Sequence, residues 1–373
     1  MCIIAGYAGN RPAAPILIEM LKKTEYIDGG LSTGIATIHE GKLYMRKVIG
    51  DVDTLIRETD ALSLPGTAGI IHSRTGNNYL SHAHPQLSAD GNLAAVDNGT
   101  MNPVLCEEFA ALSNRIMDEF KAKGIEIKSE VGEPLGYKVL SNGNGYHETE
   151  LWPLYIGERV KNSPKERLRD DLADATREII TILPADIITV NVHALVPDTI
   201  TLGTVTRPMA VALGDGEAFM CTTALAFPEY AQKRPIVFIP PTTVARVTPC
   251  GVNILSTSIE GTKVEEIDFR TARLTREDME RRLKVGEENA ISIYDLPFYT
   301  EWNEFWQKPL IDCKFKKEKT SFPLKPFASL IYEGLWSFHK EGRLRMKLGT
   351  RKLQDGREKK IVKFWLSERP PPH

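Results

Sequence analysis

The sequence predicts an α+β protein built as a layered sandwich, and three observations lead to this class. A short apolar run with β-branched residues opens the chain at residues 3–6, and strand-like runs dominate again from residue 187 onward. Between them, residues 103–123 and 166–183 carry apolar side chains at helical spacing. Because sheets and helices each bury one face, this order of elements indicates sheets and helices packed in layers.

Composition places the chain among soluble globular proteins. Its 373 residues are enough for two domains or for one large domain with an appendage. The net charge of −2 gives no general indication of nucleic acid, and no apolar run approaches the ~18 residues that a membrane span needs. The five cysteines are widely spread and form no Cys-x-x-Cys pair, which argues against disulfides and a zinc ribbon. We therefore expect a cytoplasmic protein without membrane association.

The first strand places a reactive residue at its start. If Met1 is removed, as a small residue at position two favours, Cys2 carries both a thiol and a free α-amine. An α-amine with an ordinary pKa of roughly 7.7–8.0 can take the proton of its own thiol. A Met-Cys start also occurs by chance, so the prediction of a nucleophile depends on residues further along.

The next elements alternate between helix and strand. Residues 12–23 show one apolar helical face, residues 34–38 and 43–46 are predicted to form a hairpin, and residues 52–62 a short helix. Two later strands carry polar residues at their ends, Arg74 after residues 69–73 and Asn98-Gly99 after residues 92–97. We expect both ends at one sheet edge.

These polar residues have a chemical and a structural interpretation. Arg74 is suited to bind a carboxylate, although an isolated arginine more often forms a surface ion pair. The Asn98 side chain and the Gly99 N–H can supply two donors to an oxyanion, yet Asn-Gly is also typical of a type I′ turn. His72, His82 and His84 lack an acidic or cysteine ligand at standard spacing, so we expect a hydrogen-bonded loop rather than a metal site.

The middle of the chain is predicted as helix, loop and helix, followed by a series of strands. A strand is expected to begin at residues 125–127, and residues 132–146 are rich in Gly and Asn, as loops are. After residue 187 the predicted strands cover residues 187–195, 200–205, 209–213, 218–222, 235–239 and 243–247.

Read in order, Cys2, Arg74, Asn98 and Gly99 resemble the site of a class II glutamine amidotransferase domain. This domain is an amino-terminal-nucleophile (Ntn) hydrolase, as in the glutaminase halves of glucosamine-6-phosphate synthase and amidophosphoribosyltransferase. The similarity covers about residues 2–268. The matching stretches are residues 2–7, 26–34, 69–74, 83–85, 97–99, 207–209 and 221–225.

The resemblance implies a four-layer αββα domain at residues 2–270 and a role for each matching residue. Cys2 would attack the carboxamide of glutamine, Asn98 and Gly99 would form the oxyanion hole, and Arg74 would hold the substrate α-carboxylate. The ammonia would pass to a synthase domain or partner subunit. We expect no metal, no cofactor and a homo-oligomer.

Three departures from the family pattern concern the substrate. Thr75 stands where the family usually has an aromatic residue over the glutamine side chain. Glu148 replaces the Asp that binds the substrate α-amine, and Ile3 replaces the Gly after the nucleophile. Glutamine is the leading substrate, and a different amide with an α-amino acid end is the alternative.

Residues 271–373 are predicted to form a basic appendage of helices plus a hairpin. Residues 314–363 contain 15 Lys/Arg against 5 Asp/Glu. Helices are expected at residues 274–285, 295–307 and 327–340, and a hairpin at residues 344–348 and 360–365. This α/β arrangement is compatible with a winged-helix-like module for nucleic acid or an anionic ligand, and equally with a hairpin that docks on the catalytic domain or a subunit. A non-catalytic binding module is therefore a third hypothesis.

Overall fold

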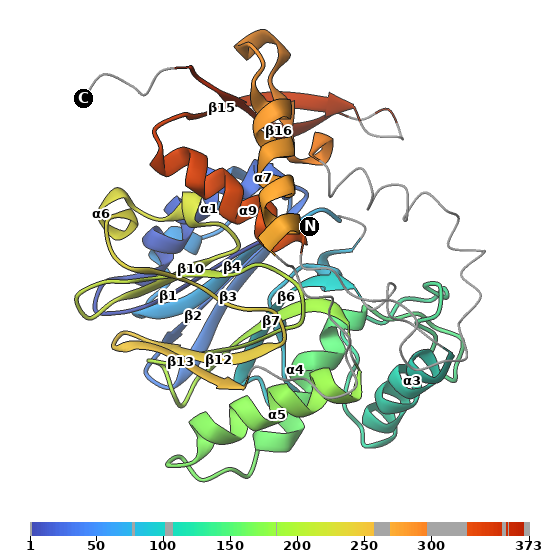
Figure 1. Ribbon diagram of the computed structural model, residues 1–373. Coiled ribbons are helices and arrows are strands. Elements are labelled where there is room, and N and C mark those ends of the chain that lie inside the picture. Colours follow the sequence, from blue (N-terminus) through green and yellow to red (C-terminus); the bar gives the residue numbers. More distant parts are fainter. Residues whose placement is uncertain are drawn as a thin grey trace.

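Two antiparallel sheets packed face to face form the centre of the molecule, and helices cover their outer faces (Figure 1). The computed structural model describes residues 2–76, 79–100, 107–183, 185–256, 269–296, 327–352, 356 and 358–368. The architecture is a four-layer αββα sandwich, so the predicted fold class is confirmed.

The first sheet has seven strands, with the amino-terminal strand near its centre. In order across the sheet these are β11 (Ile236–Phe238), β9 (Ala210–Leu213), β10 (Ala218–Cys221), β1 (Ile3–Ala8), β4 (Ala68–Arg74), β2 (Ser32–His39) and β3 (Lys42–Ile49). Every residue of β1 is buried, which explains why the sequence of this strand is apolar on both faces.

The second sheet has six strands and lies against the first. In order across the sheet these are β13 (Gly251–Ser256), β12 (Thr243–Thr248), β8 (Ile200–Thr204), β7 (Asp186–His193), β6 (Leu93–Thr100) and β5 (Gln86–Leu87). Between the sheets lies an apolar cluster to which both contribute, for example Ile4 from β1 and Val190 from β7.

Two groups of helices form the outer layers. The first sheet is covered by α1 (Ala13–Asp28) and α2 (Val52–Glu58), and the second by α3 (Glu107–Ala122), α4 (Leu151–Val160) and α5 (Leu168–Ile182). A short helix, α6 (Glu229–Gln232), follows β10. Among the described residues, no helix combines the length and the apolar character that crossing a membrane requires.

Three local predictions differ from the structure. Residues 125–127 form no strand, because the following Lys128 and Ser129 N–H groups donate to the Glu150 carboxylate at 2.8 Å instead of to a neighbouring strand. Helix α4 was not predicted. Asn98 and Gly99 form no turn, since β6 continues through them and pairs with β7.

The two strand ends also meet in a different way from the one expected. Arg74 ends β4 in the first sheet, whereas Asn98 lies in β6 of the second. They approach each other across the sandwich rather than along one sheet edge. The predicted helix at residues 295–307 lies almost wholly outside the described residues.

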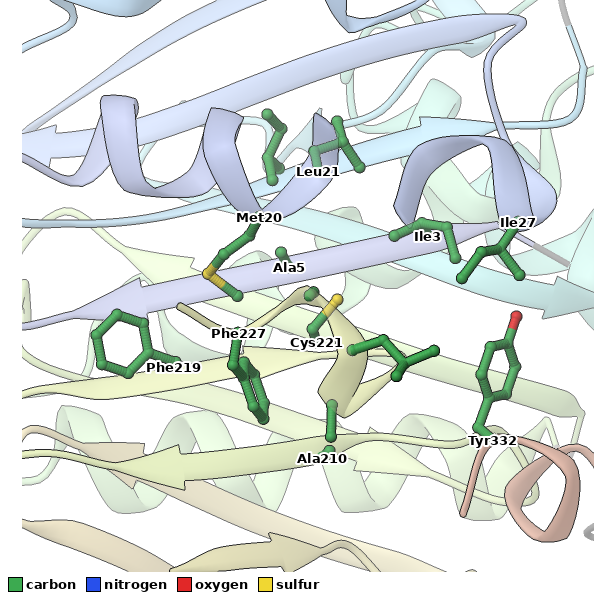
Figure 2. Packing of buried hydrophobic residues seen from close by; sticks show 14 of the residues in the cluster. Ile3, Ala5, Met20, Leu21, Ile27, Ala210, Phe219, Cys221, Phe227 and Tyr332 are labelled. Carbon is green, nitrogen blue, oxygen red and sulfur yellow. The ribbon is translucent and has the colours of Figure 1, made fainter. Parts of the chain in front are cut away.

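The carboxyl-terminal region packs on the outer face of the first sheet, beside α1. It consists of α7 (Phe269–Leu283), α9 (Phe327–Lys340) and a three-stranded sheet in the order β14 (Ile291–Ser292), β16 (Glu358–Leu366) and β15 (Leu344–Lys352). Tyr332 of α9 belongs to the same buried cluster as Ile3 and Ile27 (Figure 2). The region thus shares a hydrophobic core with the sandwich at the end of β1 that carries Cys2.

A buried carboxylate joins four elements behind this end of the sheet. Glu25 of α1 is 0% exposed and accepts hydrogen bonds from Ser73 Oγ at 2.7 Å, Thr33 Oγ1 at 3.0 Å and the Val52 N–H at 2.9 Å. Burial raises the pKa of Glu25 to about 7, although these hydrogen bonds act in the opposite direction. The carboxyl group therefore titrates near neutral pH.

We expect Glu25→Gln to change how stability depends on pH. The native state keeps this proton up to about pH 7 and an unfolded chain releases it near 4.5, so the stabilisation is complete below pH 4.5 and lost as the pH rises through 7. When the pH is raised from 5.5 to 8, the wild type should lose about 2 kcal/mol of unfolding free energy that the variant does not lose. Urea titrations at both pH values measure this. Glu19→Gln, an exposed site on the same helix, is the control, and an equal difference at both pH values contradicts the prediction.

Candidate active site around Cys2

Cys2 lies at the head of a strand that neighbours hold on both sides. The next residue, Ile3, pairs with Ser73 of β4, and Ala5 pairs with Cys221 of β10. The Ile4 N–H donates to Thr222 Oγ1 at 3.0 Å just beyond the end of β10. A thiol at this position is half-buried and has a fixed backbone, as a nucleophile requires.

The side chain of Asn98 clasps the backbone of Cys2 from the facing sheet. The Cys2 N–H donates to Asn98 Oδ1 at 3.0 Å, and Asn98 Nδ2 donates to the Cys2 carbonyl oxygen at 3.0 Å. An amide nitrogen carries two N–H groups, and one of them makes this second contact. The clasp sets the distance between the thiol and the predicted oxyanion donors.

Gly99 adopts a backbone conformation that other residues avoid. Its φ is +136°, and a Cβ atom there would lie 1.9 Å from the Asp186 carbonyl oxygen of β7. Among the described strands, β5 pairs with β6 only at Ala94 and Ala95, so it does not cover β6 at Asn98 and Gly99. Glycine is therefore required where the resemblance places a backbone oxyanion donor.

Arg74 reaches the same end of the sandwich from β4. Its Nη1 donates to the His82 carbonyl oxygen at 3.1 Å, and its Nη2 contacts His147 Nε2. Burial lowers the pKa of this guanidinium, and negative charge on Cys2 and Glu148 acts in the opposite direction. A guanidinium has five N–H donors, so these two contacts leave capacity for a carboxylate.

Two buried histidines connect Arg74 to the strand of Asn98. The Asp97 N–H donates to His84 Nδ1 at 3.2 Å, so neutral His84 carries its proton on Nε2, which lies 2.7 Å from Thr149 Oγ1. His147 Nδ1 lies 2.7 Å from the same hydroxyl and accepts a hydrogen bond from the Thr149 N–H at 3.4 Å, while its Nε2 faces Arg74. Burial is the main cause that holds the pKa of both histidines well below its usual value. Neutral imidazoles thus join the two candidate binding groups.

Glu148 is already in contact with other side chains. It lies in the short 3-10 helix Glu148–Glu150, where it accepts a hydrogen bond from Tyr137 OH. Its Oε2 is also 3.8 Å from Lys138 Nζ. A substrate α-amine at this carboxylate would therefore compete with a resident cation. Thr75 is another of the three departures from the family pattern, and its hydroxyl lies 4.0 Å from Cys2 Sγ.

The structure thus brings all six predicted residues to one end of the sandwich. Sequence reasoning gave no role to His147, Tyr137 and Lys138, although His147 is adjacent to Glu148. Nothing in the sequence indicated that Lys138 would lie near Glu148, because its position follows from the fold of the segment around it. In the part of the chain that the structure describes, no group of three His, Cys, Asp or Glu side chains is arranged to hold a metal ion.

This fold and the hydrogen-bonded cysteine are similar to those of class II glutamine amidotransferase domains, and comparisons with known proteins agree with this similarity. Among curated proteins, the glutamine--fructose-6-phosphate aminotransferase (isomerizing) of Pyrococcus horikoshii is 28% identical over 236 residues, which cover 62% of this chain and 34% of that protein. The protein of the same name from Thermosynechococcus vestitus is 28% identical over 257 residues, covering 68% and 36%. The chain therefore spans about a third of the length of these relatives. No family model matches it.

Solved structures support the same fold. Glutamine phosphoribosylpyrophosphate amidotransferase from B. subtilis superposes with a TM-score of 0.52 at 15% identity, covering 81% of this chain and 64% of that one. The allosteric regulatory enzyme of purine biosynthesis gives a TM-score of 0.50 at 15% identity, covering 70% and 50%. At such identities these matches show the fold alone.

We expect Gly99→Ala to destabilise the protein far more than Gly91→Ala. Both glycines have positive φ, but a Cβ at Gly91 meets nothing within 4 Å, whereas at Gly99 it collides with the backbone of β7. Gly91→Ala should cost about 1 kcal/mol for strain alone, and Gly99→Ala about 3 kcal/mol or more. Thermal and urea unfolding of the two variants measure this, and equal losses would contradict the steric argument.

Proposed function

We propose that this chain releases ammonia from glutamine through a thioester on Cys2. The observation that carries the proposal is the reciprocal pair of 3.0 Å hydrogen bonds between the Cys2 backbone and the Asn98 side chain, with Gly99 beside it. It holds a thiol next to two donors suited to a developing oxyanion. The relatives are named glutamine--fructose-6-phosphate aminotransferases, which supports transfer of nitrogen from glutamine as the general chemistry.

The reaction then has two halves. With Met1 removed, the α-amine of Cys2 takes the thiol proton, and the sulfur attacks the carboxamide carbon of glutamine. Asn98 Nδ2 and the Gly99 N–H bind the oxyanion, while Arg74 holds the α-carboxylate. The protonated amine returns its proton to the leaving nitrogen, which departs as ammonia. Water then attacks the thioester and yields glutamate and the free thiol.

The acceptor of the ammonia belongs to the proposal as well. The described carboxyl-terminal region consists of two helices and a three-stranded sheet packed on α1. Because class II glutaminase domains pass their ammonia to a synthase domain or subunit, we propose that another polypeptide handles the acceptor and uses the ammonia as its nitrogen source.

A glutamine-analogue electrophile tests the nucleophile directly. We expect diazo-oxo-norleucine to add once to the chain lacking Met1, because the same site that binds glutamine places the reagent at the Cys2 thiol. Intact-mass spectrometry and peptide mapping measure this. Cys2→Ala should abolish the adduct, and Cys250→Ala, which removes an exposed cysteine, should leave it unchanged. A retained Met1 with no labelling would refute the catalytic proposal.

The resident contacts of Glu148 support a second candidate, an amidase for an amide without the glutamine α-amine. Lys138 already lies near the carboxylate that would bind that amine. If glutamine is the substrate, kcat/KM for glutamine should exceed that for simple amides by at least about 100-fold, the size of one well-paired charged contact. It should also exceed that for asparagine, whose side chain is one methylene shorter and so places its amide away from the thiol. Steady-state assays of the three substrates decide between the candidates, and a preference for an amide without an α-amine would favour the second.

A further inference from the structure

A lysine from the carboxyl-terminal hairpin is buried at the Cys2 end of the sandwich. Lys359 is the second residue of β16 and is only 6% exposed, whereas the next residue, Lys360, is half-exposed and pairs with Asp51 at 3.3 Å. Lysine is rarely buried without a negative partner, because removing an ammonium from water is costly. The position of Lys359 therefore needs an explanation.

The negative group nearby is a carboxylate at an unfavourable place. Asp28 is the last residue of α1 and is 0% exposed. Its negative charge lies at the helix C-terminus, where the helix dipole is also negative. Asp28 Oδ1 accepts a hydrogen bond from Tyr294 OH, and the Tyr294 oxygen lies 3.4 Å from Lys359 Nζ. Two groups of the carboxyl-terminal region thus compensate a buried charge of the sandwich.

The residues that follow Asp28 hold the strand end that carries Arg74. The Gly30 N–H donates to Ser73 Oγ at 2.8 Å, and the Leu31 N–H donates to the Arg74 carbonyl oxygen at 3.0 Å. A Cβ on Gly29 would lie 2.7 Å from Ser73 Oγ, so the turn is in close contact with β4. A movement of Asp28 would therefore shift the backbone of Arg74.

The ionisable groups that influence Lys359 belong largely to this end of the sandwich. Burial lowers the pKa of Lys359, and the negative charges of Asp28, Cys2 and Glu25 act in the opposite direction. Arg351, which pairs with Lys359 across the hairpin, acts in the same direction as burial. Lys359 thus lies at the end of the sandwich that carries Cys2, since the turn after Asp28 bonds to Ser73 and Arg74, and Ser73 pairs with Ile3.

We propose that Lys359 and Tyr294 are positioning residues of the Cys2 site. Through Asp28 they fix the turn that supports the Arg74 end of β4, and Lys359 adds positive charge at the end of the sandwich that carries the thiol. The carboxyl-terminal region thereby completes the site from outside the sandwich. As a statement about glutamine turnover the inference rests on the proposed function, but its electrostatic part can be tested without that function.

The first test compares alkylation of Cys2 by iodoacetate, an anion, and iodoacetamide, a neutral reagent of similar size. Peptide mapping of the full-length protein at low salt gives both rates, and their ratio reports the local charge. We expect Lys359→Met to lower the ratio about fivefold and Lys359→Arg to restore it. Lys352→Met removes an exposed charge from the same hairpin and should leave it unchanged. A ratio for Lys359→Met equal to that for Lys352→Met would overturn the proposal.

The second test measures positioning. Tyr294→Phe keeps the ring and removes the hydroxyl that donates a hydrogen bond to Asp28. It should therefore raise KM for glutamine about tenfold, with a smaller change in kcat. An unchanged KM in a folded Tyr294→Phe variant would contradict this role. If Lys359→Met lowers the ratio of the two alkylation rates but the protein does not hydrolyse glutamine, only the proposed function is refuted. An unchanged ratio in an active glutaminase would defeat only this inference.

Discussion

The hydrogen-bonded clasp between Cys2 and Asn98 is the constraint on which the site depends. It joins the first strand of one sheet to a strand of the other, so the distance between the sheets sets the distance between thiol and amide. Close-packed interiors resist small changes of spacing. The apolar cluster between the sheets, with Ile4 and Val190 among its members, therefore supports the chemistry as well as the fold.

Much of the fold was predictable because it follows from the local spacing of apolar residues. The buried first strand, the helices at residues 107–122 and 168–182, and the terminal hairpin all follow from the spacing of apolar residues. Strand partners are a different matter, since pairing depends on contacts between distant parts of the chain. For this reason Arg74 and Asn98 were expected at one sheet edge, although they lie in different sheets.

The same distinction applies to the site. Residues that take part in short motifs, such as Arg74 and Asn98, could be proposed from the sequence through a family resemblance. Lys138 and Lys359 could not, because each becomes relevant only through a partner that folding brings close. Lys359 and Tyr294 are 65 residues apart and contact each other, and Tyr294 also donates to Asp28 near the start of the chain. Charged residues in a basic segment gave no indication of which ones would be buried.

The basic character of the carboxyl-terminal region has one explanation within the molecule itself. Lys359 lies beside Tyr294 and the buried Asp28, and Lys360 contacts Asp51, the residue that caps α2. Of the positive charges that first suggested an anionic ligand, Lys360 therefore contacts a carboxylate of the sandwich directly, and Lys359 is linked to another through Tyr294. Because a buried carboxylate is costly without such partners, the sandwich and the carboxyl-terminal region depend on each other. Substitutions in the hairpin must consequently be judged by their effect on the Cys2 site as well as on any external partner.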